Sequence, residues 1–230
     1  MIRLVSFDIW RTILDLSRFY DIVSNNIALI AGREHNEVKK VIDKTYKLAL
    51  IARLKGEFKR PVYDSASFFA KALDIDVDTL FKAVAKSIYD ERIGDLIYPD
   101  VIPTLKELKE RGLKIALLGN VMFWPGMVTR AILYRNGILK YIDVTLFGDE
   151  IGVQKPDKQV FHMLSSIVHC NLDEIVHVGD SLVNDFAGAL LAGVKAVLIK
   201  RDLDVNIIKL SDNAYIINRL EELLKILGSF

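Results

Sequence analysis

The chain has 230 residues, of which 51% are hydrophobic and 27% charged, proportions that suit a packed globular protein and exclude a disordered one. Its 31 Lys and Arg residues nearly balance its 30 Asp and Glu residues, and this net charge of +1 argues against a generic binder of nucleic acid or of a membrane surface. The single cysteine, Cys170, cannot form an internal disulfide, and the opening apolar run is too short for a signal peptide. We therefore expect a cytoplasmic protein with neither nucleic acid nor membrane as a partner.

The first predicted elements are a short strand and a long helical stretch. Residues 2–8 form the predicted strand, which ends in the carboxylate of Asp8. From Ser17, a residue type favoured at helix N-caps, to about Asp95, apolar residues recur every three or four positions. This spacing predicts helices and no strand. The stretch is therefore interpreted as a helical insertion after the first strand.

Beyond Pro99 the pattern alternates between helices and apolar strands. Apolar strands that alternate with helices indicate a parallel sheet covered on both faces. The predicted fold class is α/β: a doubly wound parallel-sheet core of residues 1–15 and 97–230, with an inserted all-helical domain of residues 16–96. The strands are predicted at 114–118, 142–146, 174–178 and 195–199, and the helices at about 101–111, near Pro125, at 156–169 and at 182–192.

Four short segments place polar residues just after predicted strands, where parallel sheets bind their ligands. Each segment alone has a purely structural explanation, such as helix capping at Asp180 or turn formation at Gly119. Their coincidence at successive strand ends favours a common site. The segments contain Asp8, Gly119-Asn120, Lys155 in Glu-Ile-Gly-Val-Gln-Lys-Pro, and Asp180 with Asp185 in Gly-Asp-Ser-Leu-Val-Asn-Asp.

The residue types in these segments suit one kind of chemistry. A carboxylate such as Asp8 can act as a nucleophile and divide one difficult step into two easier ones. Convergent carboxylates at Asp8, Asp180 and Asp185 repel one another unless a hard cation such as Mg²⁺ lies among them. Lys155 can neutralise charge on a transferred phosphoryl group, and the Gly119-Asn120 pair can donate hydrogen bonds to its oxygens.

In this order and at these strand ends, the four segments resemble the four motifs of the haloacid dehalogenase (HAD) superfamily. The match to Glu-x-Gly-x-x-Lys-Pro and to Gly-Asp-Ser-x-x-Asn-Asp is particularly close. The helical insertion is similar to the helical, C1-type cap of that family. The resemblance implies a Rossmann-like core and a Mg²⁺-dependent hydrolase, in the first place a phosphatase of small phosphorylated metabolites.

The same resemblance implies a role for each site residue. Asp8 is then the nucleophile that forms an aspartyl-phosphate, and also a metal ligand. Asp180 is the second acidic ligand, while Asp185 is a further ligand or orients one. Lys155 stabilises the intermediate, and Asn120 helps to hold the transferred group.

Three positions depart from the family pattern. Trp10 stands where family phosphatases usually carry an aspartate as general acid and base, which typically contributes about 10²–10⁴-fold. The Trp10 carbonyl can still bind Mg²⁺ and its ring can line the substrate pocket, but indole cannot transfer a proton. Gly119 replaces a Ser or Thr whose hydroxyl binds phosphate. Arg11 replaces a glycine and can place a cation beside the substrate.

These departures keep two alternatives open. A metal-free 2-haloacid dehalogenase attacks carbon with the same aspartate and needs no acid for its halide leaving group, but such enzymes replace the equivalent of Asp180 by serine. A catalytically degenerate member binds a phosphorylated ligand or a protein partner without turnover.

The sequence pattern is compatible with a monomer or a homodimer. His177, inside a predicted strand, is expected to be packed or hydrogen-bonded rather than catalytic.

Overall fold

The computed structural model describes residues 1–230 and separates into a sheet unit and a helical unit. The sheet unit comprises Met1–Asp15, Ile97–Asn120 and Ile138–Phe230, and the helical unit comprises Leu16–Leu96 and Val121–Gly137. The predicted division assigned residues 121–137 to the core. In the structure they group with the helices instead.

The sheet has seven strands in the order β3-β2-β1-β4-β5-β7-β6. All neighbours are parallel except β6 and β7, which form an antiparallel pair at one edge. The predicted α/β core is thus confirmed, and β6 and β7 are additions that the apolar pattern did not indicate. The strands are β1 (Leu4–Phe7), β2 (Lys114–Gly119), β3 (Val144–Phe147), β4 (Ile175–Gly179), β5 (Lys195–Ile199), β6 (Ile207–Ser211) and β7 (Ala214–Ile217).

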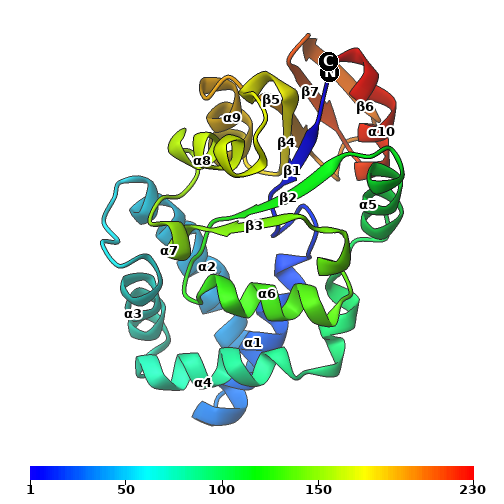
Figure 1. The fold of residues 1–230 in the computed structure, drawn as a ribbon. Coiled ribbons are helices and arrows are strands. Elements are labelled where there is room, and N and C mark those ends of the chain that lie inside the picture. The colour runs from blue at the N-terminus through cyan, green and yellow to red at the C-terminus, as the bar shows by residue number, and fades with distance from the viewer. The chain divides into compact units, whose positions relative to one another are not determined.

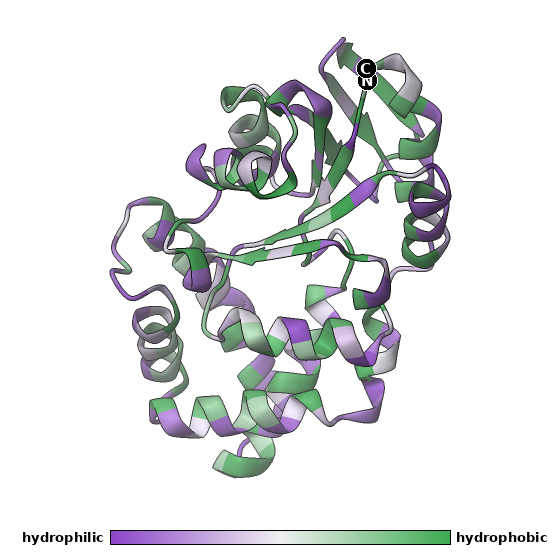
Figure 2. Ribbon diagram, in the orientation of Figure 1, coloured by the Kyte–Doolittle hydropathy of each residue, from purple (hydrophilic) through white to green (hydrophobic).

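Helices cover both faces of this sheet (Figure 1). The central strands are almost wholly buried, because side chains on both of their faces pack against helices. Figure 2 shows that these strands are mostly hydrophobic. On one face, alternate side chains such as Leu4 and Ile175 pack with Phe161 and Leu164 of α8. The flanking elements are α5 (Val101–Glu110), α7 (Gly148–Ile151), α8 (Gln159–Val168), the π-helical turn η4 (Leu182–Ala187), α9 (Gly188–Leu191) and α10 (Leu223–Ile226).

The helical unit has an aromatic core built from two separate stretches of the chain. The Phe123 ring lies 4.3 Å from that of Phe69 and 5.8 Å from that of Tyr20, and Trp124 meets Phe19 edge-on at 5.0 Å. These contacts are the physical reason why residues 121–137 belong with the helices. The helices are α1 (Leu16–Ala31), α2 (His35–Leu54), α3 (Pro61–Leu73), α4 (Val77–Ile88) and α6 (Gly126–Arg135).

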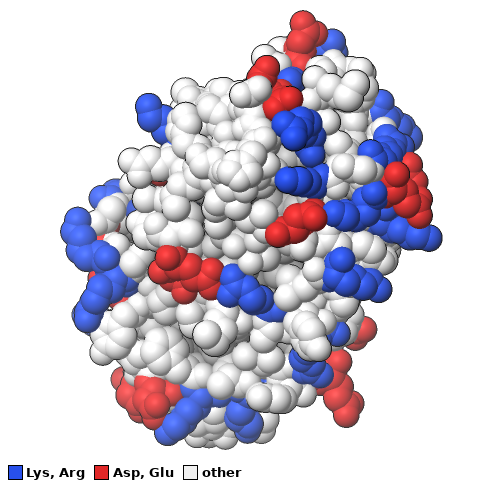
Figure 3. Space-filling view, viewed as in Figure 1, with Lys and Arg blue, Asp and Glu red and all other residues white.

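The surface carries charges of both signs. Figure 3 shows Lys and Arg interspersed with Asp and Glu on the visible face, in keeping with the near balance of charges in the sequence. No helix is both long enough and apolar enough to cross a membrane.

Candidate active site

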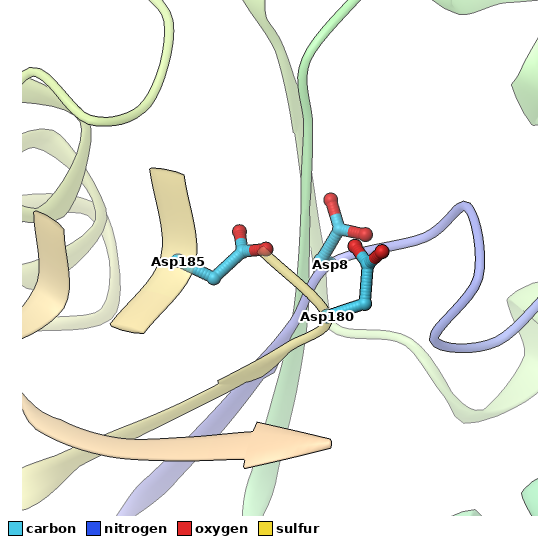
Figure 4. A group of neighbouring side chains, drawn as sticks. All are labelled: Asp8, Asp180 and Asp185. Atoms are coloured by element: carbon cyan, nitrogen blue, oxygen red, sulfur yellow. The ribbon is translucent and has the colours of Figure 1, made fainter. Parts of the chain in front are cut away.

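Three carboxylates meet at the carboxyl ends of the central strands. Asp8 directly follows β1, and Asp180 directly follows β4, the hydrogen-bonded neighbour of β1. Asp185 lies one turn further along, in η4. One oxygen atom from each of the three lies within 4.8 Å of the others. In Figure 4 the Asp8 and Asp180 carboxylates lie side by side, and the Asp185 carboxylate is directed toward them.

Lys155 connects two of these carboxylates from below the surface. Its ammonium nitrogen Nζ lies 2.8 Å from Asp8 Oδ1 and 2.7 Å from Asp185 Oδ1, and it donates to the Leu118 carbonyl at 2.7 Å. The side chain is only 1% exposed. All three ammonium protons therefore have partners, and the lysine is fixed against the predicted nucleophile.

Asn120 is bound to the backbone of Lys155. The Asn120 side-chain oxygen accepts from the Lys155 N–H at 2.9 Å, and its amide nitrogen donates to the Lys155 carbonyl at 2.8 Å. This two-bond clamp ties the end of β2 to the loop that carries the lysine. The structure thus gives Asn120 a contact that the sequence did not indicate, and its contact with a transferred group stays a prediction.

Asp185 is held by donors on several sides. Its Oδ1 faces Lys155 and His177, and its Oδ2 accepts from the Ser181 N–H at 3.0 Å. A Cβ added at Gly179 would lie 2.3 Å from the Asp185 Cγ. Only glycine at the end of β4 therefore allows this carboxylate to approach the strand so closely.

The pKa values reflect competition between burial and charge. Burial, opposed by Lys155, raises the pKa of Asp8 to about 7, and burial together with Asp185 raises the pKa of Asp180 to about 6. Burial also disfavours ionised Asp185, but Lys155 and His177 outweigh it and hold the pKa of Asp185 well below its usual range. Burial favours a neutral Lys155, yet Asp185 and Asp8 outweigh it and raise the pKa of the lysine.

We expect Mg²⁺ to stabilise the protein more as the pH rises. Asp8 and Asp180 have folded-state pKa values of about 7 and 6, above the unfolded value of about 3.9. The folded state therefore binds more protons, and folding stability falls as the pH rises from about 4 to 7. A Mg²⁺ ion held by this cluster would pair with the ionised carboxylates, so we expect added Mg²⁺ to restore this stability above pH 7 and to have little effect near pH 5.

Thermal unfolding with and without excess Mg²⁺ at these two pH values measures the effect. A free concentration about 100 times the Kd corresponds to about 2.7 kcal/mol of stabilisation. Asp180→Asn, which removes one of the three carboxylates, should reduce the increase in melting temperature at the higher pH. An equal increase at both pH values would contradict the expectation.

The loop after Asp8 contains two of the departures from the family pattern. Half-buried Trp10 forms an isolated bridge with Leu14 and so closes a tight loop. Arg11 has a φ of 67°, in the left-handed region where glycine is favoured, which explains why a glycine is usual there. The Arg11 charge lies close enough to oppose the rise in the pKa of Asp180.

Gly119 has no room for the side chain that the family usually carries there. An added Cβ would lie 2.7 Å from Phe147 Cδ1 and 3.0 Å from Ile9 Cδ1. Phe147 is buried at the end of β3, which pairs with β2, so its ring fills the space beside Gly119. The Phe147 ring therefore occupies the space beside Gly119 into which the Ser or Thr side chain usual in the family would extend.

We expect Gly119→Ser to destabilise the protein. The new Cβ forces the buried Phe147 ring or Ile9 to move, and such overpacking typically costs about 1–3 kcal/mol of unfolding free energy. Urea denaturation measures the loss. Gly119→Ala is the matched control, and it should lose about as much because the clash comes from the Cβ. Wild-type stability in both variants would show that the space is open.

Two polar residues near the site, Ser6 and Lys200, were not predicted from the sequence. Ser6, in β1, has its Oγ 2.8 Å from His177 Nδ1, which makes it a partner of the buried histidine. Lys200, directly after β5, donates to the Asp180 carbonyl at 2.8 Å. The contact between Ser6 and His177 did have a sequence signal, because each is a polar residue inside an otherwise apolar predicted strand. No comparable sequence signal marks Lys200.

Comparisons with known proteins agree with this geometry. A glyceraldehyde 3-phosphate phosphatase from Methanopyrus kandleri is 36% identical over 107 residues, 45% of this chain and 43% of that protein. The chain thus spans less than half the length of that relative. A glyceraldehyde 3-phosphate phosphatase from Methanothermobacter thermautotrophicus is 24% identical over 213 residues, 88% of each chain.

The fold and the sequence also match at the level of the family. A Bacillus subtilis HAD-hydrolase solved bound to magnesium superimposes with a TM-score of 0.82, at 18% identity and over 99% of both chains, which shows a shared fold. Residues 2–193 match the sequence pattern of haloacid dehalogenase-like hydrolases. With its sheet order, strand-end carboxylates and buried lysine, the chain belongs to the haloacid dehalogenase-like hydrolase family.

Proposed function

We propose that this protein is a Mg²⁺-dependent phosphatase of small phosphorylated metabolites, with Asp8 as the nucleophile. The observation that carries the proposal is the contact between buried Lys155 and Asp8, beside Asp180 and Asp185. This arrangement supplies a carboxylate for attack and a fixed positive charge for the transferred phosphoryl group. Phosphatases among the relatives support the same class of substrate.

The donor set fits a hard divalent cation. Three carboxylate oxygens lie within 4.8 Å of one another, and two of their pKa values are raised, so ionising the whole cluster calls for added positive charge. Asp8, Asp180, Asp185 and the carbonyl of Trp10 are the groups that would hold Mg²⁺. The ion, when bound, neutralises negative charge on the carboxylates and on the phosphate oxygens.

The protein residues then divide the reaction into two steps. An oxygen of Asp8 attacks phosphorus, the bond to the leaving oxygen breaks, and an aspartyl-phosphate forms. Lys155 stabilises the negative charge that the transferred oxygens carry. Water attacks the aspartyl-phosphate and releases phosphate and the free Asp8 carboxylate.

The residue at position 10 limits the choice of substrate. The indole N–H of Trp10 is too weak an acid to protonate a departing alkoxide, so the leaving oxygen must take its proton from water or depart as a stable anion. We infer that phosphates with good leaving groups are turned over best.

We further propose that the helical unit is the cap that selects the substrate. We also propose that the protein is a cytoplasmic monomer or homodimer.

The first test is hydrolysis of p-nitrophenyl phosphate with Mg²⁺ and with excess chelator. Turnover that requires Mg²⁺ supports the proposal, and alkyl phosphate substrates should then react more slowly than aryl ones. Dehalogenation of a 2-haloacid that persists in chelator would support the metal-free alternative instead. Binding of phosphorylated compounds without turnover under any condition would indicate a degenerate member of the family.

A further inference from the structure

Two polar side chains lie buried in the apolar layer between the sheet and α8. Ser6 of β1 and His177 of β4 are paired residues of adjacent parallel strands, and they are 0% and 1% exposed. Ser6 Oγ lies 2.8 Å from His177 Nδ1, and His177 Nε2 lies 3.2 Å from Asp185 Oδ1. A chain of contacts thus leads from the interior of β1 to the carboxylate cluster.

The partners determine which ring nitrogen carries the proton. The ionised Asp185 carboxylate can only accept hydrogen bonds, so the facing Nε2 of His177 must be the donor. In a neutral imidazole the other nitrogen, Nδ1, is then an acceptor. With Nδ1 as an acceptor, the Ser6 hydroxyl, whose Oγ lies 2.8 Å away, is placed to donate to it. Asp185 therefore sets the tautomer, and a hydrogen bond from the Ser6 hydroxyl to Nδ1 stabilises it.

The packing leaves the imidazole little freedom to turn. The ring of Phe161 in α8 meets the His177 ring edge-on, with centroids 5.2 Å apart and an interplanar angle of 75°. Asp185 itself lies on the short turn η4. Its Oδ1 is shared between His177 and Lys155, so the histidine fixes the oxygen to which the lysine also binds.

We propose that Ser6 and His177 are positioning residues that hold Asp185 in the orientation needed for both Lys155 and a metal ion. Hydrogen bonds from residues behind the ligands commonly orient metal-binding side chains in this way. The inference rests on the proposed function only for the identity of the metal. Its first part, the hydrogen-bonded order from Ser6 to Asp185, concerns the protein alone.

Nitrogen-15 NMR of metal-free wild-type protein tests this first part. We expect His177 to show a protonated Nε2 and an unprotonated Nδ1 in the folded state. Ser6→Ala should shift population toward the other tautomer, because Nδ1 loses its donor. A proton on Nδ1 in the wild type, in either a neutral or a charged ring, would overturn the inference.

Calorimetric titration of Mg²⁺ into four folded variants tests the second part. His177→Phe keeps an aromatic ring but removes both nitrogens, and we expect Mg²⁺ affinity to fall about 10- to 100-fold. His177→Gln should recover much of it, because its amide nitrogen can reach the position of Nε2. Ser6→Ala should lie between His177→Phe and wild type. Ile175→Val, a buried change on the same face of β4, is the control and should bind Mg²⁺ as wild type does.

The outcomes separate this inference from the proposed function. The inference would be overturned if His177→Phe and His177→Gln lost Mg²⁺ affinity equally, or if Ile175→Val lost as much as His177→Phe. Either result would show that core packing accounts for the loss of affinity. Wild-type protein with the expected tautomer and Mg²⁺ affinities but no phosphatase turnover would overturn the proposed function alone. Failure of the wild type to bind Mg²⁺ would overturn both the metal-dependent function and the metal part of the inference.

Discussion

Asp8→Asn should abolish phosphatase turnover while leaving the fold intact. Asparagine has nearly the same shape but is a far weaker nucleophile than carboxylate, so we expect turnover with p-nitrophenyl phosphate to fall by at least about 10³-fold. The raised pKa of Asp8, about 7, means that its charge destabilises the folded state above that pH. The melting temperature near pH 8 should therefore not fall.

This combination distinguishes loss of chemistry from loss of structure. Steady-state kinetics and thermal unfolding are measured on the same preparation. Asp212→Asn, a change at a highly exposed aspartate in the turn between β6 and β7, is the matched control and should retain full turnover. Turnover in Asp8→Asn within tenfold of wild type would remove Asp8 from the role of nucleophile.

Lys155→Met should damage both stability and turnover. The ammonium is the buried partner of Asp8 and Asp185, and removing one member of a buried ion pair typically costs about 3–5 kcal/mol. The loss should be greatest above pH 7 and should shrink in acid, where Asp8 takes up a proton. Loss of the fixed charge should also lower turnover by about 10²–10³-fold.

Denaturation at acid and alkaline pH, together with kinetics, measures these effects. Lys200→Met is the comparison, because Lys200 is also a cation near the cluster but donates to a backbone carbonyl, that of Asp180. It should lose less stability and less turnover than Lys155→Met. Equal stability losses in Lys155→Met at both pH values would show that packing, and not charge, accounts for the contribution of the lysine.

The features that could be predicted from sequence were those with a local signal. Apolar runs alternating with helical spacing predicted the α/β core, and the residues just after those runs predicted which side chains gather at the sheet edge. Asp8 and Asp180 could be placed together because the parallel strands β1 and β4 end at the same edge. The four segments together also predicted the family, which the comparisons confirm.

The features that escaped prediction depend on neighbours far along the chain. The clamp between Asn120 and Lys155 and the ring of Phe147 beside Gly119 arise only when β2, β3 and the following loop are brought together. The edge strand β6 is largely exposed and its neighbour β7 has only four residues, so neither gives a long apolar run. Periodicity identified the helix after Pro125 but could not show against which unit it packs.

The two-part aromatic core of the helical unit has a consequence for how the chain acquires its structure. Phe19 and Phe69 are made early during synthesis, whereas Phe123 and Trp124 follow only after β2 has been made. A nascent chain that ends near residue 100 would leave aromatic surface uncovered. Residues 16–96 therefore cannot complete their hydrophobic core alone. The core forms only after β1 and β2 of the sheet and the residues that follow β2 have been synthesised.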